Sequence, residues 1–422
     1  MKDYTLKYGK GSVTFALDEA HVTELYGTPV PKIDDIRAAL YATLSSPVSH
    51  EPLESWVNPG DKVALIVSDM SRFWMRQDLV VPHIISYLTD KCDVNQNNIT
   101  IIIANGTHPG GDENELRTLV TDGVYDRIRV VNHDCQAKDL VYIGTTSLGT
   151  EVRINPIAAN ADKVIMLGAC TYHVMAGYGG GRKSILPGIS GLETIRQNHL
   201  HSLDLLAPRS NPLIGNGVTD GNPLNEDMCQ AAAMVKNLFG INLVTNADMQ
   251  LAHIISGDPM KSWQLACHRD EIYRVPIVKK ADVIITSCGG YPKDMSLYQG
   301  TKIIDNVESG LNAGGTLIVL MEAVEGGGPA QYFDWLKPLK EGRLYEELKA
   351  GFTIPGYIFF MNCEQAEKYR IMLLTTADPS SLAPMGIEAY TDMAALLAAA
   401  DIADKDILLI PNGSTVVPYP KA

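Results

Sequence analysis

Residues 62–69, KVALIVSD, form a short apolar run that ends in an aspartate. A run of this length, rich in β-branched residues and leucine, is typical of a buried strand in a parallel sheet. Amphipathic stretches separate it from seven similar runs. These are residues 98–104, 127–132, 163–170, 282–287, 316–322, 370–375 and 406–411. The alternation predicts an α/β protein whose sheets are mostly parallel and flanked by helices.

The length of 422 residues favours two domains. The segment RVPIVKK, residues 274–280, follows a long helical pattern and precedes a fresh series of strands and helices. We therefore predict an N-terminal domain of residues 1–272 and a C-terminal α/β domain of residues 273–405. The last apolar run leaves residues 406–422 as a candidate addition to the N-terminal domain. The predicted helices are residues 79–92, 193–202, 223–236, 260–274, 297–312, 332–350 and 392–403.

The chain carries a net charge of −14, from 35 basic and 49 acidic residues. A surface this acidic repels phosphodiester backbones, which excludes a general nucleic-acid binder. A small anionic ligand stays compatible with this charge when a few lysines and arginines converge at one place. Any anionic substrate must therefore be held by a local group of basic side chains.

The seven cysteines are spread along the chain and form no C-x-x-C pair, which predicts thiols in a reducing compartment rather than disulfides or a zinc site. The first residues, MKDYTLKYGKGSVTF, lack the apolar core of a signal peptide. No apolar run approaches the roughly 18 residues of a membrane span. We therefore expect a soluble cytoplasmic protein with no membrane partner.

Polar and charged residues follow four of the apolar runs. Ligands of open parallel sheets bind beyond the carboxyl ends of the strands, so these residues are candidates for a functional site. The candidates are Asp69, Ser71, Arg72, His108, His173, Lys183, Tyr298, Gln299 and Lys302. Each alone could be a capping or surface residue. Their joint occurrence after strands predicts a binding or catalytic site.

Two familiar kinds of site fit the sequence poorly. In GYGGGRKS, residues 177–184, Arg182 stands where a phosphate-binding P-loop has the glycine before its lysine. His199 and His201 are two residues apart on a predicted helix and face different sides, so they cannot chelate one zinc ion together. A P-loop-like NTPase or phosphotransferase, and a non-catalytic binder of small organic acids, remain as alternatives to an enzyme of another kind.

Several segments together closely resemble one enzyme family. They are residues 69–72 (DMSR), 106–108 (GTH), 173 (H), 177–195 (GYGGGRKSILPGISGLETI), 198–199 (NH) and 297–302 (LYQGTK). The combination resembles the nickel-pincer nucleotide-dependent lactate racemase family, and the similarity spans both predicted domains. The resemblance implies a racemase or epimerase of a 2-hydroxy acid. It also implies an active site in the interdomain cleft, with the C-terminal domain closing over the substrate.

The resemblance further implies a cofactor, the nickel-pincer nucleotide, which is Ni(II) pyridinium-3,5-bisthiocarboxylic acid mononucleotide. This group brings its own sulfur ligands, so the cysteines are not expected to bind the nickel. By the same resemblance, Lys183 would be attached covalently to the cofactor and His199 would be the protein ligand to nickel. Asp69, Ser71 and Arg72 would contact the cofactor. Proteins that synthesise and insert the cofactor would be partners of the chain.

The reaction implied by the resemblance is proton-coupled hydride transfer to and from the cofactor, through a planar keto acid. His108 and His173 would be paired acid/base catalysts on opposite sides of the 2-hydroxy acid. An imidazole, with an ordinary pKa of about 6.5, can exchange protons in both directions near neutral pH. The residues implied to bind the substrate are Arg72, Tyr298, Gln299 and Lys302.

Three departures from the lactate racemases concern the substrate. Phe73 follows Arg72 where those enzymes have a proline, and Pro109 follows His108 in place of a basic residue. The stretch YIFF, residues 357–360, lacks the tryptophan that those enzymes place near the substrate. These changes leave the cofactor and acid/base groups intact, and they make a larger or more polar 2-hydroxy acid an alternative to lactate.

Overall fold

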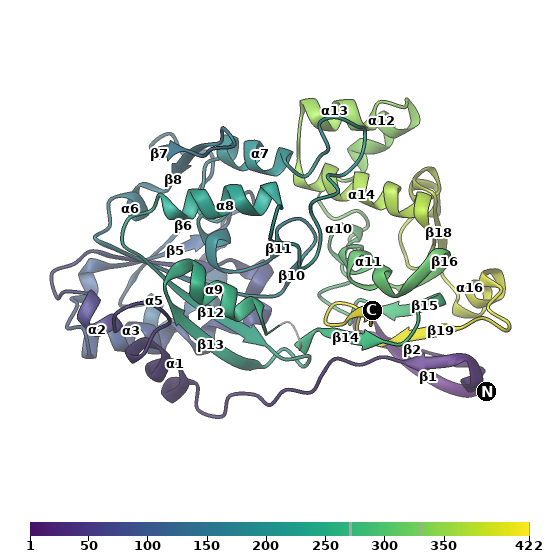
Figure 1. Ribbon diagram of the computed structural model, residues 1–422, viewed down its shortest axis with the longest axis horizontal. Coiled ribbons are helices and arrows are strands. Elements are labelled where there is room, and N and C mark those ends of the chain that lie inside the picture. The colour runs from purple at the N-terminus through teal and green to yellow at the C-terminus, as the bar shows by residue number, and fades with distance from the viewer. Residues whose placement is uncertain (270–271, 330, 422) are drawn as a thin grey trace. The chain divides into compact units, whose positions relative to one another are not determined.

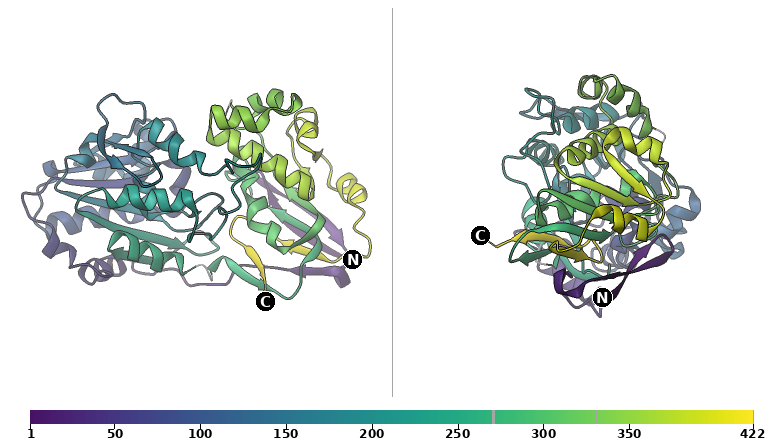
Figure 2. Two further views of the ribbon diagram at one scale, coloured as in Figure 1. Left: turned by 45° about the horizontal axis from the view of Figure 1, so that its top comes forward. Right: turned by 90° about the vertical axis from the view of Figure 1, so that its right-hand side faces the viewer.

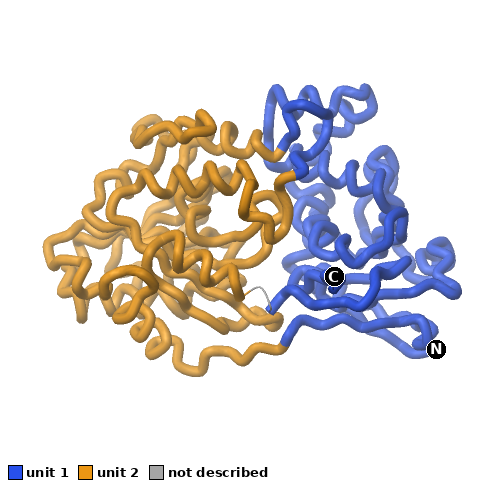
Figure 3. Tube along the Cα trace, viewed as in Figure 1, with its two compact units in different colours: residues 1–28, 203–212, 271–422 blue, residues 29–202, 213–270 orange. Residues whose placement is uncertain are grey.

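The computed structural model describes residues 1–269, 272–329 and 331–421. The chain divides into two compact units (Figure 3). Unit 1 comprises residues 1–28, 203–212 and 271–422, and unit 2 comprises residues 29–202 and 213–270. Each unit contains its own six-stranded sheet.

The sheet of unit 2 has the strand order β13-β12-β9-β4-β5-β6 (Figure 1). All neighbouring pairs are parallel except β12 with β13. The strands are β4 (Val63–Ser68), β5 (Ile99–Ala104), β6 (Arg129–Asn132), β9 (Lys163–Ala169), β12 (Leu238–Thr245) and β13 (Leu251–Gly257). Residues 63–67 of β4 are buried on both faces, as expected for a central strand covered on each side.

Alternating side chains of these strands build the core of unit 2. Leu65 and Ile101 pack with apolar residues of helices α1, α3 and α4 on one face. On the other side, Gly168 of β9 lets the glycine-rich segment lie directly on the sheet, since a Cβ there would be 3.0 Å from Gly180 Cα. The helices are α1 (Ile36–Ser45), α2 (Leu53–Trp56), α3 (Val81–Asp90), α4 (Glu113–Val120), α5 (Asp122–Tyr125), α6 (Pro156–Ala159), α7 (Leu192–Leu200), α8 (Pro223–Ala233) and α9 (Pro259–Cys267).

Unit 2 also contains two small hairpins and several 3-10 turns. Strands β7 (Val141–Thr145) and β8 (Glu151–Ile154) pair with each other, as do β10 (Tyr172–His173) and β11 (Gly177–Tyr178). The 3-10 turns that matter for the site are η2 (Met70–Met75) and η5 (Gly181–Ser184). Turn η2 follows β4 of the main sheet, and η5 follows the small hairpin β10–β11, which comes after β9.

The sheet of unit 1 has the order β18-β17-β16-β15-β19-β3 and is parallel throughout. Its strands are β3 (Val22–Glu24), β15 (Ala281–Ser287), β16 (Leu311–Leu320), β17 (Arg370–Leu374), β18 (Ile387–Tyr390) and β19 (Ile407–Ile410). The hairpin of β1 (Lys2–Tyr8) and β2 (Gly11–Leu17) packs with α16 on one face of this sheet. Figure 2 shows the purple hairpin beside the strands of unit 1.

The remaining elements of unit 1 are mostly helices. They are α10 (Leu297–Gly300), α11 (Lys302–Val307), α12 (Leu336–Lys340), α13 (Leu344–Ala350), α14 (Ile354–Lys368), α15 (Pro379–Leu382) and α16 (Met393–Ala400). A separate parallel pair joins β14 (Arg274–Ile277) to β20 (Val417–Pro420). No helix among the described residues combines the length and apolar character needed to span a membrane.

The predicted fold class is confirmed, and each of the eight predicted strands is present. Helix 260–274 was predicted too long: α9 ends at Cys267, residues 270 and 271 lie outside the described residues, and strand β14 begins at Arg274. Helix 297–312 is two short helices followed by a 3-10 turn and the start of β16. The predicted helix 332–350 is divided into a 3-10 turn and the two helices α12 and α13, and α14 was not predicted.

The division into units differs from the predicted domains in three places. Residues 1–28 belong with the C-terminal segment because β3 pairs with β19 and the first hairpin packs on that sheet. Residues 203–212 also lie in unit 1, where Tyr345 Oη donates to the Asp204 carbonyl oxygen. The described part of 406–422 stays in unit 1, since β19 pairs with β15. These pairings join segments that are far apart in the chain, so the local residue pattern could not predict which unit each segment belongs to.

Candidate active site

Asp69 and His108 follow the neighbouring strands β4 and β5. His108 Nδ1 lies 2.6 Å from Asp69 Oδ2, and Ser71 Oγ donates to Asp69 Oδ1 at 2.6 Å. Because a carboxylate only accepts hydrogen bonds, His108 Nδ1 carries a proton and the lone pair of the neutral ring lies on Nε2. A histidine held in this way can accept a proton through Nε2, as histidines paired with carboxylates do in hydrolases.

The carboxyl group of Asp69 is mostly buried but remains ionised. Burial raises its pKa, but the hydrogen bond and charge of His108, the Ser71 hydroxyl and the charge of Arg72 together bring the pKa below its ordinary value. Arg72 Nη1 lies 3.4 Å from Ser71 Oγ, on the same 3-10 turn. The predicted residues 69, 71, 72 and 108 therefore form one cluster, in which Asp69 is hydrogen-bonded to the catalytic candidate His108.

The turn that carries His108 is fixed by its own backbone. The amide of His108 donates to the Asn105 carbonyl at 2.9 Å, and Gly106 adopts a φ of 55°, which glycine tolerates without strain. Asn105 Nδ2 donates to Asn132 Oδ1 and to the His133 carbonyl, both at 3.1 Å. The Gly106 amide also donates to the Gly188 carbonyl at 3.0 Å, which ties this turn to the segment after Lys183.

His173 and Lys183 form a second cluster. Lys183 Nζ lies 3.1 Å from His173 Nε2. His173 Nδ1 accepts the backbone amides of Met175 and Ala176, both at 3.2 Å. An Nδ1 that accepts leaves the proton of the neutral ring on Nε2, the opposite tautomer to that of His108, so in this tautomer Nε2 donates to a neutral Lys183 amine. The two predicted acid/base residues are thus held with complementary protonation at Nε2.

His199 is buried on helix α7, with 2% of its surface exposed. Its Nδ1 lies 2.9 Å from the Ile195 carbonyl, so Nδ1 donates and the lone pair of the neutral ring is on Nε2. Burial, with a contribution from the charge of Lys183, lowers the pKa of His199 to about 3. A neutral imidazole whose other nitrogen donates to a backbone carbonyl is the state that metal-binding histidines adopt.

We expect the cofactor-free protein to lose stability as the pH falls below about 6.5, the ordinary histidine pKa. The folded-state pKa of His199 is lowered, and the pKa of buried His133 is lowered by burial as well. The unfolded chain therefore binds more protons than the folded chain between that ordinary value and the lowered one. For one such histidine the free energy of unfolding falls by up to about 1.4 kcal/mol per pH unit.

Urea unfolding of the cofactor-free protein at pH 7 and pH 5 measures this effect. The His199→Leu variant should show a smaller difference between the two pH values, whereas the exposed control His268→Gln should behave as the wild type. An unchanged pH dependence in His199→Leu would contradict the assignment of His199 as a buried neutral imidazole.

The described residues offer few places where several side chains could bind one metal ion. Within the described residues, no group of three or more histidine, cysteine, aspartate and glutamate side chains could hold a metal ion. The seven cysteines are present as thiols. A metal at His199 would therefore need most of its ligands from a non-protein group.

The phosphate-binding alternative lacks its usual architecture. A P-loop joins a strand of the main sheet directly to a helix. Here the glycine-rich segment leaves the small hairpin β10–β11 and enters η5, a 3-10 turn of four residues. Lys183 Nζ contacts His173 rather than a glycine-lined phosphate cradle.

The predicted substrate-binding residues of unit 1 form their own cluster. Lys302 Nζ donates to Gln299 Oε1 at 3.0 Å and lies 4.1 Å from the centre of the Tyr298 ring. All three come from the adjoining helices α10 and α11. Their role as substrate contacts stays a prediction.

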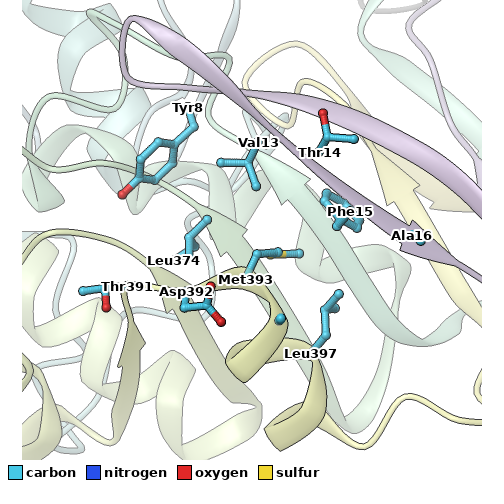
Figure 4. A pocket seen from close by; sticks show the side chains of 11 residues that line it. Tyr8, Val13, Thr14, Phe15, Ala16, Leu374, Thr391, Asp392, Met393 and Leu397 are labelled. Carbon is cyan, nitrogen blue, oxygen red and sulfur yellow. The ribbon is translucent and has the colours of Figure 1, made fainter.

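A separate pocket of unit 1 contains none of the predicted site residues. It has a volume of about 630 Å³ and lies between the β1–β2 hairpin and the start of α16 (Figure 4). Its lining is mostly apolar and includes Val13, Phe15, Leu374, Met393 and Leu397. Its carboxylate, Asp392, caps α16 by accepting the Ala395 amide at 2.8 Å. We assign no catalytic role to this pocket.

Sequence reasoning missed two buried polar groups beside the site. Arg182 is fully buried immediately before Lys183. Asp227 is fully buried and accepts hydrogen bonds from Thr146, Thr150 and Asn198, at 2.5, 2.8 and 2.8 Å. Asn198 precedes His199, so this network holds the helix that carries the metal-ligand candidate. The sequence signal for Asp227 was an acidic residue among the apolar residues Leu224, Met228 and Ala231 of a predicted helix.

Comparison with known proteins identifies the family of this chain. Residues 8–209 match the lactate racemase N-terminal domain, and residues 277–418 match the lactate racemase C-terminal domain. The lactate racemase of Thermoanaerobacterium thermosaccharolyticum is 27% identical over 350 residues, covering 81% of this chain and 79% of that protein. The lactate racemase of Lactiplantibacillus plantarum is 28% identical over 334 residues, covering 78% and 76%.

Solved structures share the fold. The lactate racemase apoprotein from T. thermosaccharolyticum superimposes with a TM-score of 0.88 at 24% identity, covering 99% of this chain and 100% of that chain. A structural-genomics protein from Thermotoga maritima gives a TM-score of 0.66 at 15% identity, covering 92% and 97%. The homologous racemases place the chain among the isomerases. It belongs to the lactate racemase family.

Proposed function

We propose that this enzyme interconverts the enantiomers of a 2-hydroxy acid, with lactate as the first candidate and a larger or more polar acid as the alternative. The observation that carries the proposal is the presence in unit 2 of two hydrogen-bonded pairs, Asp69–His108 and His173–Lys183, together with the buried neutral imidazole of His199. Racemisation needs a base and an acid that can exchange roles. His108 offers an Nε2 lone pair as the base, and His173 would act as the acid in its imidazolium form, which becomes a neutral imidazole after it has given a proton to the alkoxide.

We further propose that a nickel-pincer nucleotide is the cofactor. Its requirements fit the residues present: Lys183 offers an amine for attachment, and His199 offers one neutral nitrogen ligand. The lack, within the described residues, of any cluster of three or more metal-ligating side chains suits a metal whose other ligands come from the nucleotide. When bound, the group would supply a hydride acceptor and donor for the carbon that bears the hydroxyl. Proteins that make and insert the cofactor are the partners this proposal requires.

The side chains of this protein would transfer the protons of the reaction and stabilise the negative charge of the substrate. His108, oriented by Asp69, would accept the hydroxyl proton through Nε2 from one enantiomer, while His173 as an imidazolium would give its Nε2 proton to the alkoxide of the other enantiomer. In the reverse direction the deprotonated Nε2 of His173 would accept the hydroxyl proton and His108 would return one. Arg72 would hold the substrate carboxylate or the developing oxyanion, for which its guanidinium offers a two-pronged hydrogen-bonding group. We propose Tyr298, Gln299 and Lys302 as further substrate contacts.

The proposal is tested with protein produced together with the cofactor-synthesis enzymes. The loaded protein should convert pure D- or L-enantiomers of lactate, or of another acid in a panel of 2-hydroxy acids, into racemates without added NAD. Chiral chromatography measures the conversion. Tight binding of Mg²⁺-ATP with no racemisation would favour a phosphotransferase, and binding of hydroxy acids with neither cofactor nor turnover would favour a simple binder.

Lys183→Ala provides the second test of this proposal. Intact-mass spectrometry of the loaded wild type should show a covalent adduct, and the adduct and the racemisation should both disappear in Lys183→Ala. Lys261→Ala, which changes an exposed lysine of α9, is the matched control and should retain both. An adduct that persists in Lys183→Ala would place the attachment at another residue.

A further inference from the structure

Arg182 is a guanidinium that the acid/base chemistry does not use, yet it is fully buried beside the site. Its Nη1 donates to the carbonyls of Tyr178, Gly179 and Gly180 at 2.8, 3.3 and 3.2 Å. Its Nη2 donates to the Ala176 carbonyl at 2.7 Å. The side chain thus folds back over the segment that precedes it and gathers four of its carbonyl groups.

Two helices that are labelled in Figure 1, α8 and α9, contribute side chains that contact this guanidinium. From α8, Asn225 Oδ1 accepts Arg182 Nε at 2.9 Å. From α9, the ring of Trp263 lies under the guanidinium, 3.8 Å from its carbon, and Trp263 Nε1 donates to the Gly179 carbonyl at 2.9 Å. Guanidinium groups are attracted to the face of a tryptophan ring, especially where water is excluded.

The segment held by these contacts has little conformational preference of its own. Gly177, Gly180 and Gly181 all adopt a positive φ, of 75°, 68° and 51°. Glycine loses more backbone freedom on ordering than any other residue, so such a segment stays ordered only when other groups hold it. A Cβ at Gly181 would be 2.6 Å from Trp263 Cγ, which shows how closely the backbone approaches that ring.

The residue that emerges from this segment is Lys183. Its amide donates to the Gly180 carbonyl at 3.1 Å, and its Nζ lies 3.1 Å from His173 Nε2. The position of the amine therefore depends on the path of residues 176–181. Burying a guanidinium costs free energy, and an apolar side chain would fill the same space without that cost. The hydrogen bonds from the Arg182 guanidinium to four backbone carbonyls therefore indicate that Arg182 has a specific structural role in this segment.

We propose that Arg182, with Trp263, is the positioning residue for Lys183: it holds residues 176–181 so that the amine is directed toward His173 before the cofactor arrives. The role in cofactor loading rests on the proposed function, whereas the ordering of the segment does not. Arg182 touches neither substrate nor cofactor in this assignment and acts through Lys183.

Hydrogen exchange of the cofactor-free protein tests the ordering. In Arg182→Met, which keeps an unbranched side chain but removes all five donors, amides of residues 176–184 should exchange at least 10-fold faster than in the wild type. Amides of α8 should be unchanged. Trp263→Phe keeps an aromatic ring but removes the Nε1 donor, and it should show a smaller change in the same segment. Arg153→Met is the matched control, because Arg153 is an exposed arginine over the Tyr142 ring.

Cofactor loading is the second readout. The rate of adduct formation at Lys183, followed by intact mass, should fall at least 10-fold in Arg182→Met and should stay at the wild-type value in Arg153→Met. Wild-type exchange and wild-type loading in a folded Arg182→Met would overturn the inference. Faster exchange across the whole of unit 2 in both Arg182→Met and Trp263→Phe would also overturn it, since the role would then be general stability. Absence of an adduct in the wild type would instead count against the proposed function.

Discussion

Replacing either His108 or His173 by alanine is expected to lower kcat for racemisation by about 10²- to 10⁴-fold, the usual contribution of a positioned acid or base. In the cofactor-free resting state the two neutral imidazoles are held in different tautomers. His108 is held by Asp69 with its Nε2 lone pair available for a proton, and His173 is held by two backbone amides with its proton on Nε2. Neither residue can therefore substitute for the other.

The equilibrium between two enantiomers has a constant of one, so kcat/KM must fall equally for both enantiomers in each variant. Chiral chromatography in both directions measures this directly. His83→Ala, on helix α3 away from the predicted site residues in sequence, is the control and should retain activity. Robust turnover in both His108→Ala and His173→Ala would show that other groups move the protons.

Asp69→Asn is expected to reduce kcat by about 10²- to 10⁴-fold while leaving the fold intact, by analogy with the loss of the carboxylate from histidine–aspartate pairs. The amide has nearly the size of the carboxylate, but its NH₂ group can donate to His108 Nδ1, which then must accept. The neutral ring would carry its proton on Nε2, and the lone pair needed for proton acceptance would be lost. The 2.6 Å distance between Asp69 Oδ2 and His108 Nδ1 makes this coupling direct.

Nitrogen-15 NMR of the cofactor-free protein separates this effect from a loss of cofactor binding. The wild type should show His108 protonated at Nδ1, and Asp69→Asn should shift the population toward the Nε2-protonated form. Asp78→Asn is the matched control, since Asp78 pairs with Arg76 at 2.8 Å on the adjoining segment. An unchanged tautomer together with lost loading would mean that Asp69 acts on the cofactor, as the family resemblance implies, and not through His108.

The local patterns of the sequence identified eight of the twelve strands described in the two six-stranded sheets, and missed β3, β12, β13 and β18. Each run such as residues 62–69 is apolar throughout, because a central parallel strand is covered on both faces. The residues after these runs were found because parallel strands bring their carboxyl ends to one edge. The same reasoning overextended helix 260–274 and missed α14, because helix ends depend on tertiary packing as well as local sequence.

The sequence by itself determined the α/β class, the set of candidate site residues and the family resemblance, because these depend on residue types and short spacings. Only the tertiary structure decided that residues 1–28 belong with the C-terminal segment. The tertiary structure also decided that Asp69 is hydrogen-bonded to His108 and that Arg182 donates hydrogen bonds to the carbonyls of the glycine-rich segment. Those facts depend on groups brought together from distant parts of the chain, or on the path of a backbone with little preference of its own. Burial and hydrogen bonding then set which nitrogen of each histidine carries the proton.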